Sequence, residues 1–219
     1  MPRSKREREV SLTKVKKKTK ETKIGLVEEV RKAVDEYPHA FVFVIENARS
    51  SKFVQVRQMF KSNSRFFFGK NNVMAIALGK DKANEYANGL HKVSQLLKGQ
   101  CGLMFTHAPK DEVIKYFTEL KDADYARAGA IATQTIELSE GPLPQFPFSI
   151  EPQLRKLGLP TKLDKGAVML TQDWTVCKEG DTLNAEQSRI LKLLDEKLSE
   201  FQVILKAYWS KKTSIQDLV

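Results

Sequence analysis

Apolar residues in the first part of the chain recur three or four residues apart in some segments and run continuously in others. The first spacing predicts a helix over residues 23–37, with Thr22 as its cap and Pro38 after its end. The apolar face of this helix consists of Val27, Val30, Val34 and Tyr37. The continuous run Phe41–Ile45 is β-branched and aromatic, which predicts a buried strand.

Helical and strand-like segments continue to alternate as far as residue 120. A second helix is predicted from its cap Ser51 to about Lys61, and its buried side chains are Phe53, Val56 and Phe60. The segments that follow are a strand over 65–68, a helix over 73–97, a strand over 102–107 and a helix over 109–120. This alternation predicts an α/β fold in which helices cover a layered sheet.

The pattern changes from Gly129, where short strand-like pieces and five prolines within 142–160 indicate a smaller unit inserted into the first. A helix is predicted over 186–198, and the apolar run 201–209 predicts a strand that rejoins the first sheet. The expected domains are a basic extension (1–22), an α/β domain (23–128 with 195–210), an insertion domain (129–194) and a C-terminal tail (211–219).

Charge narrows the class of partner. The 219 residues are 41% hydrophobic, enough for a folded core, and the net charge of +10 favours a polyanion, either nucleic acid or an acidic membrane surface. No run of 18 apolar residues occurs and the start of the chain is highly charged, so neither a membrane span nor a secretory signal is expected. The cytosol or the nucleus is therefore the expected location.

The positive charge is concentrated in two places. Residues 1–23 carry +7 of the total, as a solvated tail, a nuclear import signal or a polyanion contact would require. The second stretch lies inside the predicted fold and contains no Asp or Glu, but seven basic residues: Arg49, Lys52, Arg57, Lys61, Arg65, Lys70 and Lys80. Charges of one sign repel one another, so a phosphate backbone is the expected neutralising partner.

Signatures of catalysis are missing, so we expect no enzyme, no cofactor and no metal site. Gly69-Lys70 lacks the second glycine and the Ser or Thr of a P-loop, and is better interpreted as a turn where backbone and Lys70 approach a phosphate, with a solvent-exposed turn as the alternative. His39, His91, His107, Cys101 and Cys177 form no spaced triad or metal set. Phe66, Phe67 and Phe68 are expected in the core, with base stacking as the alternative.

At Phe53–Arg57 and Phe68–Asn72 the sequence resembles the ribosomal stalk-base family, called L-ten in bacteria and P-zero in eukaryotes. That family has a Gln-x-x-Arg-like helix followed by a strand ending in Met-Gly-Lys-Asn-Thr. Further matching segments are 98–106, 127–132, 158–162 and 180–181, in register over roughly residues 20–210. Phe68 in place of Met, Asn72 in place of Thr and the basic leader make the chain most similar to the nucleolar branch known as mRNA turnover protein four.

The resemblance implies an assembly factor that occupies the stalk-base site on large-subunit rRNA in pre-60S particles until the stalk protein replaces it. It implies neighbouring ribosomal proteins as partners, a monomer within the particle, no membrane or small-molecule ligand, and a nucleolar and nuclear location, with shuttling to the cytoplasm left open. Stalk proteins continue beyond the segment equivalent to 201–209 into helices and an acidic tail. Since this chain stops at Val219, we expect RNA binding without recruitment of translation factors.

Family roles carried over by matched position predict an RNA-binding set in which basic side chains contact phosphate and ribose and the two asparagine amides bond specifically. The set is Lys23, Arg49, Lys52, Gln55, Arg57, Lys61, Arg65, Gly69, Lys70, Asn71 and Asn72. The alternatives are a structural stalk-base protein with a short tail and an RNA-processing or mRNA-decay enzyme. The second has no support in the residues.

Overall fold

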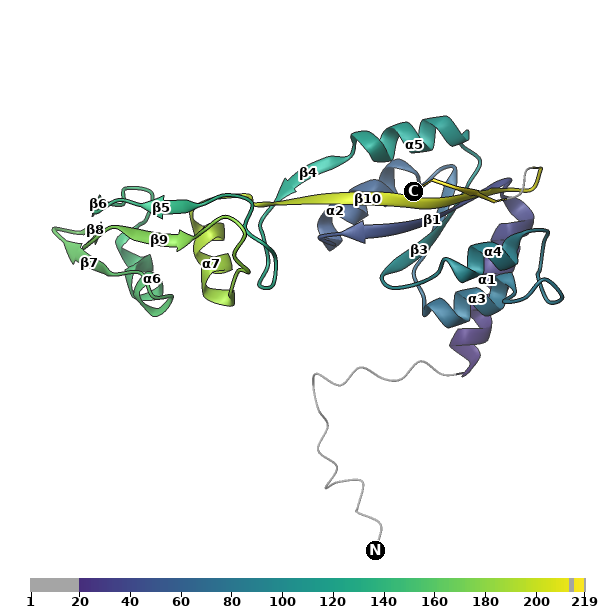
Figure 1. The fold of residues 1–219 in the computed structure, drawn as a ribbon, viewed down its shortest axis with the longest axis horizontal. Helices are drawn as coiled ribbons and strands as arrows, with labels where there is room; N and C mark the ends of the chain where they lie inside the picture. The colour runs from purple at the N-terminus through teal and green to yellow at the C-terminus, as the bar shows by residue number, and fades with distance from the viewer. Residues whose placement is uncertain (1–19, 213–214, 219) are drawn as a thin grey trace, which may run out of the picture. The chain divides into compact units, whose positions relative to one another are not determined.

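The computed structural model describes residues 20–212 and 215–218 (Figure 1). The predicted basic extension therefore lies, up to residue 19, outside the described residues. Contacts within the chain divide it into two compact units: the described residues of Met1–Val42, Arg65–His107 and Ala207–Leu218 form unit 1, and Phe43–Ser64 with Ala108–Lys206 form unit 2. These divisions differ from the domain boundaries predicted above, which stay a prediction.

The main sheet confirms the predicted α/β class. Its strands follow the order β11 (Gln216–Asp217), β10 (Ser199–Ser210), β1 (His39–Glu46), β3 (Cys101–Thr106) and β2 (Ser64–Phe67), and β4 (Lys121–Asp124) pairs antiparallel with the start of β10. Every residue of β3 is buried, as a central strand covered on both faces requires. The last long apolar run joins the first sheet, as predicted.

Unit 1 contains three helices that pack in sequence. α1 (Lys20–Glu36) contacts α3 (Asn71–Leu78), which contacts α4 (Leu90–Gln95), and Figure 1 shows the three together. Val30, Ala33 and Val34 of α1 are buried, in agreement with the apolar spacing that predicted this helix. Pro38 follows the end of α1, because proline cannot continue a helix.

In unit 2, α2 (Ser50–Met59) and α5 (Lys110–Glu119) are joined by aromatic contacts. Phe60 stacks on Phe117, with ring centroids 5.6 Å apart, and meets Tyr116 edge-on. Phe53 and Val56 of α2 are buried as predicted, so the opposite side of this helix is left for solvent or a ligand.

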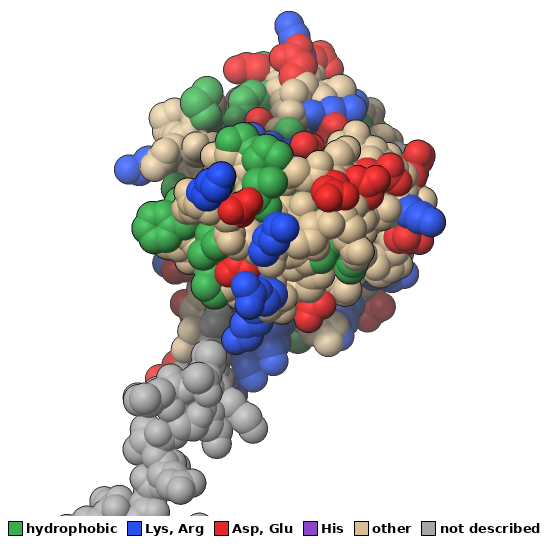
Figure 2. Space-filling model, turned by 90° about the vertical axis from the view of Figure 1, so that its left-hand side faces the viewer, with side chains coloured by type: hydrophobic (Ala, Val, Ile, Leu, Met, Phe, Trp, Pro, Cys, Tyr) green, Lys and Arg blue, Asp and Glu red, His purple; other side chains and the backbone are tan. Residues whose placement is uncertain are grey.

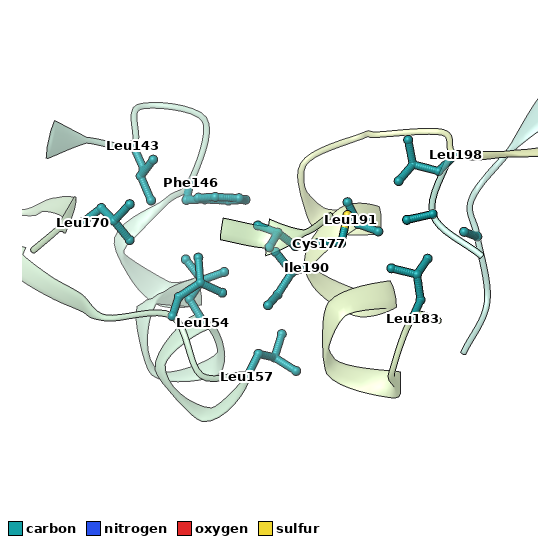
Figure 3. Close-up of a cluster of buried hydrophobic side chains, with 14 of the residues drawn as sticks. Leu143, Phe146, Leu154, Leu157, Leu170, Cys177, Leu183, Ile190, Leu191 and Leu198 are labelled. Carbon is teal, nitrogen blue, oxygen red and sulfur yellow. The ribbon is translucent and has the colours of Figure 1, made fainter. Parts of the chain in front are cut away.

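The remainder of unit 2 consists of two small sheets and two helices. β5 (Ile136–Leu138) pairs with β9 (Trp174–Cys177), and β8 (Ala167–Leu170) lies between β6 (Gly141–Pro142) and β7 (Thr161–Asp164). With the 3-10 turn η2 (Phe148–Ile150), α6 (Glu151–Lys156) and α7 (Ala185–Leu193), they enclose an apolar cluster (Figure 3). Leu154 and Leu191 are fully buried in it.

Several local predictions were wrong. The helix expected over 73–97 is two helices, because Gly79 and Gly89 adopt positive φ values of 97° and 83° and interrupt it. The predicted caps also fail: Thr22 lies inside α1, and α2 begins at Ser50 after an extended Arg49 without a side-chain cap. The strand β4 and the helix boundary at Leu193, rather than Leu198, were not anticipated.

Candidate nucleic-acid interface

The solvent-facing side of α2 carries polar and basic side chains at helical spacing. Phe53, Val56 and Phe60 point into the fold, which leaves the intervening positions outside. We call the exposed set Val54, Gln55, Arg57, Gln58 and Lys61 the α2 surface. Four of its members, all except Gln55, line a hollow of about 220 Å³. Gln55, Arg57 and Lys61 are thus accessible, as an RNA contact requires.

A second accessible segment is the turn between β2 and α3. Phe68, Gly69 and Lys70 connect the two elements, and Lys70 precedes the first helical residue with an extended backbone and no side-chain cap. The start of an uncapped helix presents N–H groups and the positive end of its dipole, which favour an anion. Lys70 and Asn72 are exposed beside this helix start.

The glycine in this turn is explained by packing rather than by approach to a ligand. Gly69 does not have a left-handed backbone, and a Cβ built there would lie 2.6 Å from Cδ2 of Leu26 in α1. This close contact joins the turn to α1, and Lys23 lies one helical turn before Leu26 on the same side. The expectation that Gly69 exists for close contact with a ligand is therefore replaced by a contact inside the protein.

Asn71 is also used inside the protein. Its side-chain Nδ2 donates to the carbonyl of Gly99 at 2.8 Å, so its amide hydrogens are not both available for RNA as predicted. The same bond places the loop at residues 98–100 beside the turn, with Lys98 and Gln100 exposed. Sequence reasoning missed Lys98 as a site residue, although the Lys98–Gly102 segment was among those that matched the family. We call Lys23, Phe68, Lys70, Asn72 and Lys98 the glycine-turn surface.

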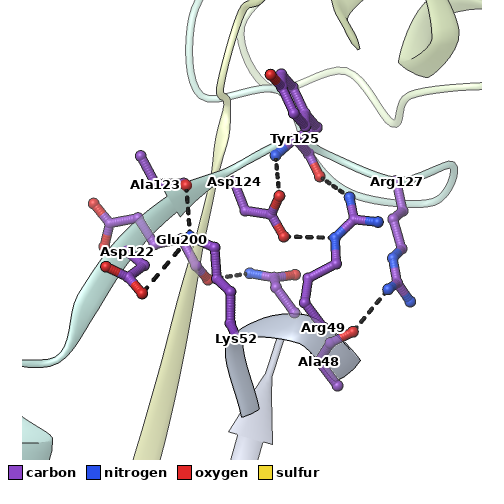
Figure 4. Close-up of polar contacts among 10 residues, drawn as sticks. Ala48, Arg49, Lys52, Asp122, Ala123, Asp124, Tyr125, Arg127 and Glu200 are labelled. Atoms are coloured by element: carbon purple, nitrogen blue, oxygen red, sulfur yellow. Dashed lines mark hydrogen bonds and ion pairs between the residues drawn. The ribbon is translucent and has the colours of Figure 1, made fainter. Parts of the chain in front are cut away.

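Two of the predicted RNA-binding cations lie in a polar cluster within unit 2 (Figure 4). Arg49 Nε lies 2.5 Å from Asp124 Oδ2, and its Nη2 donates to the Tyr125 carbonyl at 3.0 Å. Lys52 Nζ donates to the Ala123 carbonyl at 2.9 Å and lies 3.8 Å from Asp122 Oδ2. Phosphate contact by these two side chains stays a prediction, but both are already neutralised from within the chain.

The electrostatics of Asp124 agree with a committed ion pair. Burial acts to raise its pKa, but hydrogen bonds from Arg49 and the Tyr125 N–H, with the charges of Arg49 and Lys52, outweigh burial and hold the pKa below its ordinary value. Arg127 adds a further link, donating from Nη2 to the Ala48 carbonyl at 2.7 Å. The cluster thus joins the start of α2 to the segment that follows β4.

Arg65 is paired more weakly. Its Nη2 lies 3.2 Å from Glu29 Oε2, and both side chains are about half exposed. An exposed pair of this kind contributes little stability, so a phosphate can replace the carboxylate at small cost. Arg65 therefore remains available to a polyanion in a way that Arg49 does not.

The acid-free stretch is thus only partly neutralised by the rest of the chain. Within residues 20–212 and 215–218, no ion pair to a carboxylate is found for Arg57, Lys61, Lys70 or Lys80, and all four are exposed. By contrast, residues 126–195 hold eight basic and nine acidic residues. Figure 2 shows a face from the end where β6, β7 and β8 lie, with Lys and Arg among Asp, Glu and hydrophobic side chains. The excess positive charge therefore belongs to the α2 and glycine-turn surfaces.

Other chemistry was sought in the described part of the chain. No group of three or more His, Cys, Asp or Glu side chains there could hold a metal ion, and no helix there is long and apolar enough to cross a membrane. Cys101 and Cys177 are buried free thiols, and burial raises the pKa of Cys177. A thiol with a raised pKa is a poor nucleophile at neutral pH.

Comparison with known proteins follows the two parts of the sequence pattern. The model of the ribosomal protein L10 family matches residues 18–121, and the model of the insertion domain in the 60S ribosomal protein of the L10 type matches residues 126–195. The ribosome assembly factor mrt4 of Dictyostelium discoideum is 40% identical over 211 residues, covering 96% of this chain and 94% of that protein.

More distant relatives extend the comparison. The Saccharomyces cerevisiae ribosome assembly factor MRT4 is 33% identical over 227 residues, covering 98% of this chain and 96% of that protein. The large ribosomal subunit protein uL10 of Methanopyrus kandleri is 28% identical over 179 residues, covering 81% of this chain but 50% of that protein.

Proposed function

The chain belongs to the ribosome assembly factor Mrt4 family, and from this premise we propose that it binds large-subunit rRNA at the stalk base of pre-60S particles. In this proposal it holds the site until the ribosomal stalk protein replaces it. The family is related to uL10, so both proteins are suited to the same RNA. Neighbouring ribosomal proteins are its further partners, and its place of action is the nucleolus and nucleus.

The observation that carries the proposal is the set of exposed cations without carboxylate partners on the α2 and glycine-turn surfaces. Arg57, Lys61 and Lys70 belong to it, within the region that matches the L10 family. An uncompensated group of cations is unfavourable until counterions or phosphates neutralise it, and phosphate binding releases the counterions. A folded RNA offers several phosphates at fixed positions, which suits cations held on helices and turns.

Charge reversal on these surfaces tests the proposal. We expect Arg57→Glu and Lys70→Glu in the full-length protein each to weaken binding to a transcribed stalk-base fragment of large-subunit rRNA by about 10- to 100-fold, because each loses a charge-assisted hydrogen bond. Titrations over a KCl series should also show a flatter dependence of log K on log salt, by about 0.7–0.9 for each phosphate that the variant no longer neutralises.

The matched control is Lys178→Glu, which makes the same charge change at an exposed site among the balanced charges of residues 126–195. Its affinity should stay within about threefold of the wild type, because only long-range repulsion changes. Equal losses in all three variants would indicate non-specific attraction to net charge. Unchanged affinity in Arg57→Glu and Lys70→Glu would contradict the proposed surfaces.

The similarity to uL10 also supports a second candidate, a structural stalk-base protein of the mature ribosome. Sedimentation of tagged protein from cell extracts separates the two. An assembly factor travels with nuclear pre-60S particles and is absent from polysomes, whereas a structural protein is present in polysomes. Recovery in polysomes at the level of a ribosomal protein would exclude the placeholder role.

A further inference from the structure

The three consecutive phenylalanines at 66–68 are treated differently by the fold. Phe67 is buried, with its ring edge-on to Phe105 and centroids 5.7 Å apart, and Arg65 lies over its face. Phe68 comes one residue after the end of β2 and has 46% of its surface exposed. The expectation that all three aromatics serve the core is therefore wrong for Phe68.

The surroundings of Phe68 are basic and polar. Lys70 follows two residues later, and Asn72 is exposed at the start of α3. The hydrogen bond from Asn71 to the Gly99 carbonyl adds Lys98, and the contact between Gly69 and Leu26 adds Lys23 from α1. An accessible aromatic ring thus lies in a group of cations on the glycine-turn surface.

This combination has a specific chemical meaning. Cations hold the backbone of a nucleic acid, and an exposed aromatic face stacks on a base that is not paired. A paired base presents no free face to a side chain, because its neighbours in the helix cover both faces. A protein partner that buried the ring would need carboxylates to meet the surrounding lysines, whereas an RNA strand supplies base and phosphate together.

We infer that Phe68 stacks on an unpaired nucleotide of the bound RNA while Lys70 and Lys98 hold the adjoining phosphates. The inference rests on the proposed function, and it names the RNA element recognised: a bulged or looped-out base beside a folded backbone. The glycine-turn surface then reads the shape of the RNA through one displaced base, and the α2 surface contributes electrostatic affinity.

Salt dependence separates stacking from charge. With the full-length protein and the transcribed stalk-base rRNA fragment, Phe68→Leu should weaken binding by about 5- to 150-fold at every KCl concentration. The slope of log K against log salt should not change, because stacking releases no counterion. Phe68→Trp retains an aromatic face and should bind within about threefold of the wild type. Lys70→Gln should instead reduce the slope by about 0.7–0.9.

The position of Phe68 makes the test independent of folding, since an exposed side chain is replaced by a smaller apolar one. Circular dichroism and thermal unfolding verify this for each variant. A second measurement uses a photocrosslinking benzoyl-phenylalanine at position 68 in the same complex. Crosslinks to one unpaired nucleotide are the expected result.

Two results would overturn the stacking inference while leaving the proposed function intact. One is Phe68→Leu with wild-type affinity while Lys70→Gln is weakened. The other is a crosslink from position 68 only to protein in isolated pre-60S particles, which would assign the ring to a protein neighbour. Failure of the proposed function has a different signature, in which neither Arg57→Glu nor Lys70→Glu changes RNA affinity.

Discussion

Removal of Arg49 should destabilise the protein, because its guanidinium is the main partner of a mostly buried carboxylate. The side chain of Asp124 is 10% exposed and that of Arg49 is 30% exposed. Arg49→Ala leaves Asp124 with the Tyr125 N–H at 2.8 Å as its hydrogen-bond donor, and it frees the Tyr125 carbonyl. Removing one partner of a buried pair costs about 3–5 kcal/mol, and partial exposure of Arg49 reduces this to about 2–3 kcal/mol.

The assay is thermal unfolding with a double-mutant cycle. For a chain of this size each kcal/mol lowers Tm by about 2–4 °C, so Arg49→Ala should lower Tm by about 4–12 °C. Asp124→Asn should be less costly in the Arg49→Ala background than in the wild type, with a coupling of about 1–3 kcal/mol. Arg57→Ala is the matched control, since exposed Arg57 has no carboxylate partner in the described chain and should change stability by less than about 0.5 kcal/mol.

The pH dependence of this pair has a definite sign. The pKa of Asp124 is lowered in the folded protein, so the pair contributes stability above the unfolded value of about 3.9. That contribution is lost as pH falls through the folded pKa, so the wild type and Arg49→Ala should converge in stability in acid and differ fully at neutral pH. A wild-type Tm for Arg49→Ala at pH 7, or strictly additive effects in the cycle, would refute the ion pair.

Two further variants test the fold. Gly79→Ala should cost about 3 kcal/mol or more, because φ is +97° and the new Cβ would lie 2.4 Å from the Asn84 carbonyl oxygen; Gly25→Ala, with open space at a helical site, should stabilise by up to about 1 kcal/mol. Leu154→Ala should cost about 2–5 kcal/mol in urea unfolding because Leu154 is fully buried, whereas half-exposed Leu163→Ala should cost under about 1 kcal/mol. Equal costs within either pair would contradict the packing described.

The elements that the sequence predicted well are those with a clear period and a clear end. α1 shows buried residues at helical spacing and a following proline, and β10 shows an apolar run long enough for a central strand. The helix predicted over 73–97 failed because apolar residues continue through the loop at 79–89, where two glycines with positive φ decide the backbone. β4 has no apolar alternation at all, and its pairing with β10 was not visible locally.

The candidate site shows the same limit in electrostatic form. The absence of acids between Arg49 and Lys80 is a fact of the sequence, but Asp124 lies 75 residues beyond Arg49 in the chain and reaches it only after folding. Gly69 was also a strong local signal with the wrong local explanation, because Leu26 comes from a helix more than 40 residues earlier. Segment composition can therefore suggest a binding surface, but the fold decides which of its charges remain free.

This division of the cations changes what a salt titration should count. If all seven basic residues of the acid-free stretch met phosphates, neutralising any one of them would flatten the salt dependence of RNA binding by about 0.7–0.9. With Arg49 and Lys52 neutralised inside unit 2, glutamine at either position should leave the slope unchanged, whereas glutamine at Arg57 or Lys70 should reduce it. Arg65, in its exposed pair with Glu29, should behave like the second group, because a phosphate can displace that carboxylate at little cost.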